Sequence, residues 1–267
     1  MPAFYTNNIT DNRRNYSENK SRLDNNKYLD GTPTAIFNNY GINDARGDTG
    51  APTMRSAVTG WLGAARVASS IGTEIYMIVP FNYGNGSYNT YKTAFIGGYQ
   101  DYLDSNPDDT RVYLIDLGVK AWDAVDNNST DDLHPNDTGS AILAGLIKDA
   151  LTPLVIKNLT GTVDSDTGVS LTWEYPDPDT NNIRHINTDY LVEYQTSGTS
   201  MWTMYTILPG VVTGVQITGL SAGTEYNFRI TSLNTLLPDE KPNADVSLKT
   251  TGTAPVPSVP TNPTSPS

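Results

Sequence analysis

Apolar residues gather in three short runs in the first half of the chain. These runs cover residues 34–40, 74–80 and 111–117, and Gly, Pro, Asn or Asp residues flank each of them. A continuous apolar run of this length is typical of a strand that is buried on both faces, as in a parallel sheet. We therefore expect three parallel strands in this part of the chain.

Between and after these runs, apolar residues recur at every third or fourth position. This helical spacing covers residues 54–70, where Thr53 can cap the helix, and then residues 90–104 and 136–151. Alternating strands and helices are the pattern of an α/β three-layer domain, in which helices cover both faces of a parallel sheet. We place this domain at residues 1–152.

The pattern changes at Pro153. The apolar runs become short, alternate with polar residues and are separated by turn signals, which is typical of antiparallel strands. Such runs occur at residues 169–176, 189–198, 201–208 and 213–234. We expect an all-β sandwich over residues 153–251, followed at 252–267 by a Pro/Thr/Ser-rich linker or tail.

The sequence LSAGTEY at residues 220–226 resembles the Leu-x-Pro-Gly-Thr-x-Tyr corner of fibronectin type III domains, with Ala222 in place of the proline. The resemblance implies that the Tyr226 hydroxyl bonds back to the preceding loop. It also implies that Trp173 is the core tryptophan. Such modules serve as spacers and adhesive units, so this fold alone indicates no ligand.

Charge and composition exclude several classes of function. The net charge is -12, and no basic cluster exceeds Arg13-Arg14, so we expect binding to neither nucleic acid nor an anionic membrane. No segment has the roughly 20 apolar residues of a membrane helix. The chain has no cysteine. We expect an extracellular, cell-surface or virion protein, with any export signal upstream of Met1.

No metal or cofactor is expected. The acidic pairs at residues 108–109, 131–132 and 177 with 179 lack the alternating oxygen ligands of a calcium loop. The two histidines, without cysteine, do not suit structural zinc, and no glycine loop precedes a helix to hold phosphate. His185 lies in a polar insert, where we expect it to be solvated.

The strongest candidate chemistry lies in the sequence DDLHPN at residues 131–136. Asp131 precedes His134 by three residues, so one turn can bring both side chains together. The carboxylate then orients the imidazole, which faces a substrate as a general base. The alternative is a polar loop in which an Asp caps the following helix and the histidine has no role.

A second candidate follows the first apolar run, which ends in the sequence GIND. Such a turn lies at the carboxyl end of a parallel strand, where the Asn43 side chain can donate to a developing oxyanion. Further along, Tyr83 and Tyr88 lie in a Tyr/Asn/Gly-rich segment. Their rings either stack on sugars or pack at the rim of the site.

The ordered pair of GIND and DxxHPN resembles the SGNH (GDSL-type) hydrolase family over about residues 3–152. The resemblance implies a flavodoxin-like α/β fold that transfers acyl groups. It assigns Asn43 to the oxyanion hole, Asp131 and His134 to the acid and base, and carbohydrate or other acyl esters to the substrate. Gly41 and Asp44, together with Tyr83 and Tyr88, are then the candidate substrate-binding residues.

The sequence departs from this family in two respects. It contains no Gly-Asp-Ser block, so the nucleophilic serine is missing. The family's first, central strand is also missing, and the strand that ends at GIND would then present an open apolar edge. We expect an upstream segment, a partner chain or reshaped N-terminal residues to cover that edge.

Two main hypotheses of function follow. The first is an ester hydrolase whose acid-base half is present here and whose serine comes from upstream sequence or from a partner chain. The second is a non-catalytic surface or phage virion protein that binds a glycan or a protein through the α/β scaffold and the fibronectin module. A weaker third option is that His134 activates water directly.

Overall fold

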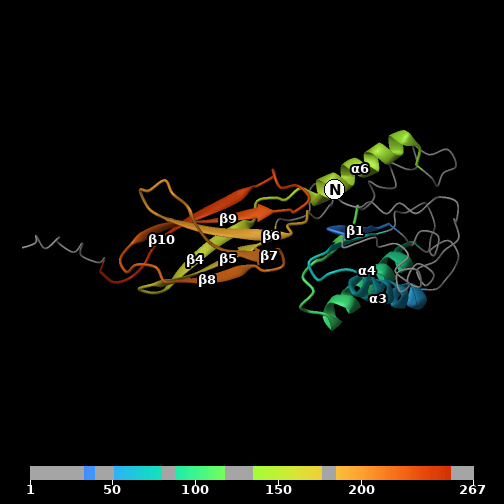
Figure 1. The fold of residues 1–267 in the computed structure, drawn as a ribbon, viewed down its shortest axis with the longest axis horizontal. Coiled ribbons are helices and arrows are strands. Elements are labelled where there is room, and N and C mark those ends of the chain that lie inside the picture. The colour runs from blue at the N-terminus through green and yellow to red at the C-terminus, as the bar shows by residue number, and fades with distance from the viewer. Residues whose placement is uncertain (1–32, 40–50, 80–87, 118–134, 176–184, 254–267) are drawn as a thin grey trace, which may run out of the picture. The chain divides into compact units, whose positions relative to one another are not determined.

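The computed structural model describes residues 33–39, 51–79, 88–117, 135–175 and 185–253 (Figure 1). The chain divides into two compact units. Unit 1 comprises Met1–Leu154, Asp177–Thr188 and Asn234–Glu240. Unit 2 comprises Val155–Pro176, Asp189–Leu233 and Lys241–Ser267.

Unit 1 contains a parallel sheet of three described strands. They are β1 (Ala35–Asn38), β2 (Glu74–Ile78) and β3 (Val112–Ile115), in the order β1-β2-β3. Almost every residue of these strands is buried, as a sheet covered on both faces requires. The three parallel strands are therefore confirmed, each slightly shorter than its apolar run.

Among the described residues, three helices pack on the two faces of this sheet. Side chains of α3 (Ala51–Ala68) and α4 (Tyr88–Ser105) form one core with Ile75 and Met77 of β2. The end of α6 (Asp137–Leu151) forms a second core with Tyr76 and Ile78, which point to the opposite face because strand side chains alternate. Figure 1 shows α3 and α4 on one side of β1 and α6 on the other.

The start of α3 differs from the expectation. Thr53 was expected to cap a helix that begins after it, but the helix already begins at Ala51, so Thr53 lies within the first turn. Pro52 explains the earlier start, because its fixed φ suits the first turn of a helix and its missing N–H has no partner to lose there.

The histidine at residue 185 also differs from the expectation. His185 is half-buried rather than solvated, and its Nδ1 lies 2.8 Å from the carbonyl oxygen of Thr152. The neighbouring Ile186 is buried and its N–H donates to the Ala150 oxygen at the end of α6. The expectation for His185 was therefore wrong, because the apolar Ile186 beside it packs in the core of unit 1 and holds the histidine against the end of α6.

Unit 2 consists of two antiparallel sheets. One has the strand order β10-β9-β6-β7 and the other β4-β5-β8. The strands are β4 (Lys157–Ser165), β5 (Gly168–Glu174), β6 (Asp189–Thr196), β7 (Thr203–Pro209), β8 (Gly214–Thr218), β9 (Glu225–Leu233) and β10 (Asn243–Lys249). Apolar side chains from both sheets form a single core, so this unit is an all-β sandwich.

Two aromatic residues fix this sandwich as expected. Trp173 is buried in the core and meets Tyr190 edge-on, with ring centroids 5.4 Å apart. The Tyr226 hydroxyl accepts a hydrogen bond from the Ser221 N–H at 3.0 Å. Gly223, which lies between Ser221 and Tyr226 in the sequence, has φ +62°, a conformation that favours glycine. The tyrosine corner and the core tryptophan are both confirmed.

Candidate functional site

The predicted catalytic residues lie outside the part of the chain that the structure describes. This holds for Asp131, His134 and Asn43. It also holds for the candidate substrate-binding residues Gly41, Asp44, Tyr83 and the side chain of Tyr88. The structure therefore neither brings these side chains together nor separates them, and their roles stay predictions.

The described elements on either side of them do have a defined geometry. β1 ends at Asn38, just before GIND, and α6 begins at Asp137, just after DDLHPN. At the amino ends of the strands, the Glu74 carboxylate at the start of β2 accepts a hydrogen bond from Thr235. Asn234 beside it donates to Ile186, whose own N–H bonds to the end of α6. The start of α6 therefore faces the carboxyl edge of the sheet.

The first turn of α6 is capped by Asn136. Its side chain accepts a hydrogen bond from the Gly139 N–H at 3.0 Å, and its own backbone is extended, as at an N-cap. The alternative in which an Asp caps this helix is therefore wrong.

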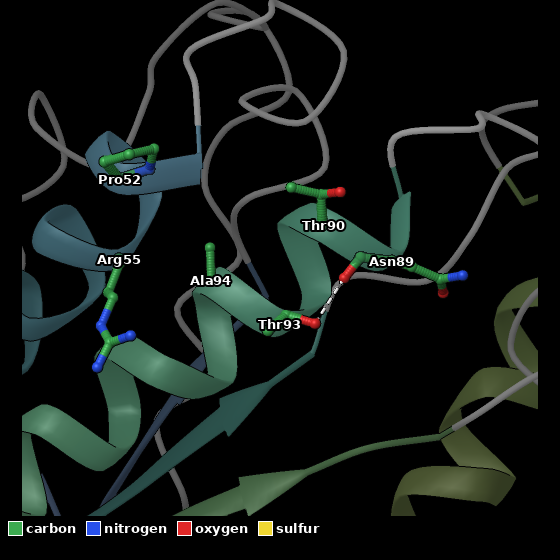
Figure 2. A pocket seen from close by; sticks show the side chains of 6 residues that line it. All are labelled: Pro52, Arg55, Asn89, Thr90, Thr93 and Ala94. Atoms are coloured by element: carbon green, nitrogen blue, oxygen red, sulfur yellow. Dashed lines mark hydrogen bonds between the residues drawn. The ribbon is translucent and has the colours of Figure 1, made fainter.

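A groove lies between the first turns of α3 and α4. It has a volume of about 560 Å³, and Figure 2 shows the side chains that line it. They are Pro52 and Arg55 of α3 and Asn89, Thr90, Thr93 and Ala94 of α4. Lys92, in the same turn of α4, forms an ion pair with Asp116 directly after β3, with 2.6 Å between nitrogen and oxygen. The groove therefore lies at the carboxyl edge, where α/β proteins bind ligands.

The groove opens because the two helices cross closely one turn below it. A Cβ at Gly98 of α4 would lie 2.3 Å from the Arg55 carbonyl oxygen and 2.8 Å from the Val58 Cβ. The Thr59 hydroxyl also donates to the Gly98 oxygen, at 2.9 Å. The helices thus touch at a position without a side chain, one turn away from the groove.

Arg55 lines the groove, but its positive charge is paired with the carboxylate of Asp101. Its guanidinium forms two hydrogen bonds of 2.6 Å to the Asp101 carboxylate. Those bonds raise the pKa of Arg55 and, through the same hydrogen bonding, lower the pKa of Asp101. The guanidinium lies over Gly97, where a Cβ would come within 3.2 Å of its central carbon. The pair presents a flat polar surface without net charge.

The α4 side of the groove carries neutral polar groups. Asn89, Thr90 and Thr93 are exposed, and the Thr93 hydroxyl donates to the Asn89 carbonyl oxygen at 2.8 Å, as the dashed line in Figure 2 shows. Because that hydroxyl donates within the helix, its lone pairs remain able to accept a bond from a ligand. Pro52 and Ala94 add apolar surface.

The sequence contained one signal for this groove. Gly97-Gly98 falls inside the predicted helix 90–104, where each glycine costs about 1 kcal/mol relative to alanine. A glycine pair in a helix interior indicates close packing against a neighbour. It did not reveal which neighbour, so the six lining residues were missed.

Two features are absent from the described segments, a cluster of metal-ligating side chains and a helix able to cross a membrane. No group of three or more His, Cys, Asp or Glu side chains there could hold a metal ion. Nor does any helix in those segments combine the length and apolar character needed to span a bilayer.

Comparisons with known proteins identify one part of the chain. Residues 154–242 match the fibronectin type III domain. This fibronectin match covers β4 to β9 of unit 2, ends just before β10, and explains the tyrosine corner. No curated protein matches the chain.

Several solved structures of fibronectin modules resemble part of the chain. The FN5 domain of Drosophila Lar is 14% identical, and the match covers 38% of this chain and 99% of that one, with a TM-score of 0.30. The FN3 domain of human collagen XX is 13% identical over 38% of this chain and 94% of its own, with a TM-score of 0.30. A two-domain segment of chicken tenascin is 19% identical over 38% of this chain and 51% of its own, with a TM-score of 0.31.

Proposed function

We propose that unit 1 is an SGNH-type ester hydrolase domain, carried by a protein that also contains a fibronectin module. The observation that supports this is the parallel sheet itself. The strand before GIND ends at its carboxyl edge, and the helix after DDLHPN begins there. Both motifs therefore leave described elements at the edge where α/β enzymes build their sites.

In this proposal the residues divide one acyl transfer among them. His134 takes the proton from a serine hydroxyl as that oxygen attacks the ester carbonyl, and Asp131 holds the imidazole and stabilises its charged form. Asn43 donates to the oxyanion that forms. His134 then protonates the departing alcohol, and water repeats the sequence to release the acid.

The serine is supplied from outside this sequence, because no Gly-Asp-Ser block occurs in it. An upstream segment or a partner chain would contribute it together with the strand that covers β1. The substrate class is an acyl or acetyl ester of a carbohydrate. The neutral polar groups that line the groove between α3 and α4 suit such a substrate.

A second function is favoured by the missing serine. If no other segment supplies it, the domain is a non-catalytic descendant that binds a glycan or a protein on a cell surface or virion. Such a domain would keep the scaffold and the fibronectin module, and the groove would bind its ligand without any catalysis.

Hydrolysis of p-nitrophenyl acetate separates the two functions. The assay uses the protein as isolated from its source, so that any upstream segment or partner chain is retained. For a hydrolase we expect His134→Ala to lower kcat/KM by about a hundred- to ten-thousand-fold, since a general base contributes that much. His185→Ala, at the other histidine of the chain, is the control and should retain turnover.

A folded protein with no turnover that still binds a glycan would establish the second function. Turnover that survives His134→Ala would contradict His134 as the base and, with it, the SGNH-type mechanism.

A further inference from the structure

We infer that the groove between α3 and α4 is a subsite for an uncharged sugar, and that it selects against anionic glycans. This deepens the proposed function and rests on it for the position of the reacting ester. The groove would hold the sugar while the acyl group reaches the catalytic residues. Binding itself is measurable without any turnover.

The size and position of the groove support this inference. Its volume of about 560 Å³ falls within the range of roughly 300–1,000 Å³ that is common for small-molecule sites. The tight contact at Gly98 fixes the distance between its walls, so the groove exists before a ligand arrives. A preformed site loses little conformational entropy on binding.

The chemistry of the walls matches a sugar ring. A sugar carries hydroxyl groups at its edges and C–H groups on its faces. Asn89 offers both donor and acceptor atoms, and the hydroxyls of Thr90 and Thr93 offer acceptors at the same rim. Pro52 and Ala94 present C–H surface that can cover a ring face.

The charges of the walls determine which sugars fit. Arg55 is the only ionisable side chain among the described residues that line the groove. Asp101 holds it through two bonds of 2.6 Å, so its charge is already compensated. A carboxylate or sulfate on the ligand would gain little from this neutralised guanidinium, would lie close to the Asp101 carboxylate, and would be repelled by the chain's net charge of -12. A neutral glycan does not meet this repulsion.

The test is a titration of the whole protein with defined tetrasaccharides. Xylotetraose, cellotetraose and N-acetylated chitotetraose are the neutral probes, and tetragalacturonate is the anionic one. We expect at least one neutral probe to bind by calorimetry, and tetragalacturonate to bind at least tenfold more weakly. Binding of tetragalacturonate alone, or of no neutral probe, would overturn the inference.

A substitution locates the binding site. Thr90→Trp places a large side chain in the groove at an exposed position, and we expect it to weaken binding of the neutral probe at least tenfold. Gln100→Trp makes the same change at an exposed position further along α4 and should bind as the wild type does. Asn89→Ala, which removes only polar atoms, should weaken binding without altering the thermal transition. Equal affinity in Thr90→Trp and Gln100→Trp would sink the subsite.

These outcomes are separable from those of the esterase assay. Glycan binding that is lost in Thr90→Trp, in a protein without turnover, leaves the subsite standing and removes the hydrolase. Turnover that depends on His134, with glycan binding unaffected by Thr90→Trp, supports the hydrolase and removes the subsite.

Discussion

The carboxylate of Asp109 ties three parts of unit 1 together. It accepts bonds from the Arg66 guanidinium at 2.7 and 2.9 Å and from the Tyr102 hydroxyl at 2.7 Å. Asp109 is 6% exposed and Tyr102 is 3% exposed. In this network Tyr102 is the donor, so the bond to Asp109 requires its hydroxyl to be neutral.

This network predicts a loss of stability at high pH. Burial, and then the bond to Asp109, raise the pKa of Tyr102 to about 12 from an ordinary value of 10.0. Below pH 10 the neutral hydroxyl contributes its full stability. That contribution falls as pH rises toward 12, because the unfolded chain releases this proton first.

Urea unfolding of the wild type and of Tyr102→Phe at several pH values checks this. The difference in unfolding free energy between them should be constant from pH 7 to 9 and shrink between 10 and 12. A difference that stays constant up to pH 12 would contradict the raised pKa.

At the scale of helices and strands, the crossing of α3 over α4 depends on a single glycine. Gly98→Ala should destabilise the protein by about 1–3 kcal/mol, because its Cβ would meet the Arg55 carbonyl at 2.3 Å and force the helices apart. Gly63→Ala in α3 is the matched control. Apart from its chain neighbours and its own helix backbone, no described atom lies within 4 Å of the added Cβ, so helix propensity alone should stabilise this variant by up to about 1 kcal/mol. Chemical denaturation measures both.

The same elements separate what sequence reasoning can find from what it cannot. Strands and helices of unit 1 follow from local periodicity, and the tyrosine corner from a short motif around Tyr226. The start of α3 was misplaced, since Pro52 extends the helix backward. The groove could not be found, because it depends on the contact of Gly98 with Arg55, and periodicity does not specify which helix faces cross.

The candidate catalytic residues are a different case. The motifs around Asn43 and His134 were found from their residue types and from the family that their ordered pair resembles, and they lie outside the described residues. What the structure adds is the parallel sheet from which they depart. Such a sheet constrains where loops begin and end, but the directions of loop side chains depend on contacts that no local pattern encodes.

At the scale of the whole molecule, charge dominates behaviour in solution. The chain carries 29 acidic and 17 basic residues, with a pI near 4.4. Mutual repulsion should keep it dispersed at neutral pH, and solubility should pass through a minimum near pH 4.4. Light scattering at fixed protein concentration across pH 3–8 measures this. A minimum near neutral pH would show that apolar surface, rather than charge, governs association.

The separation between the glycine contact and the groove above it has a use in protein engineering. Asn89, Thr90 and Thr93 are exposed and contribute no side chain to the apolar core. They also take no part in the helix contact at Gly98. Randomising these three positions in a display library would vary recognition while the framework stays constant, much as antibody loops vary on a fixed sandwich. Selected clones that bind new saccharides should fold as well as the parent.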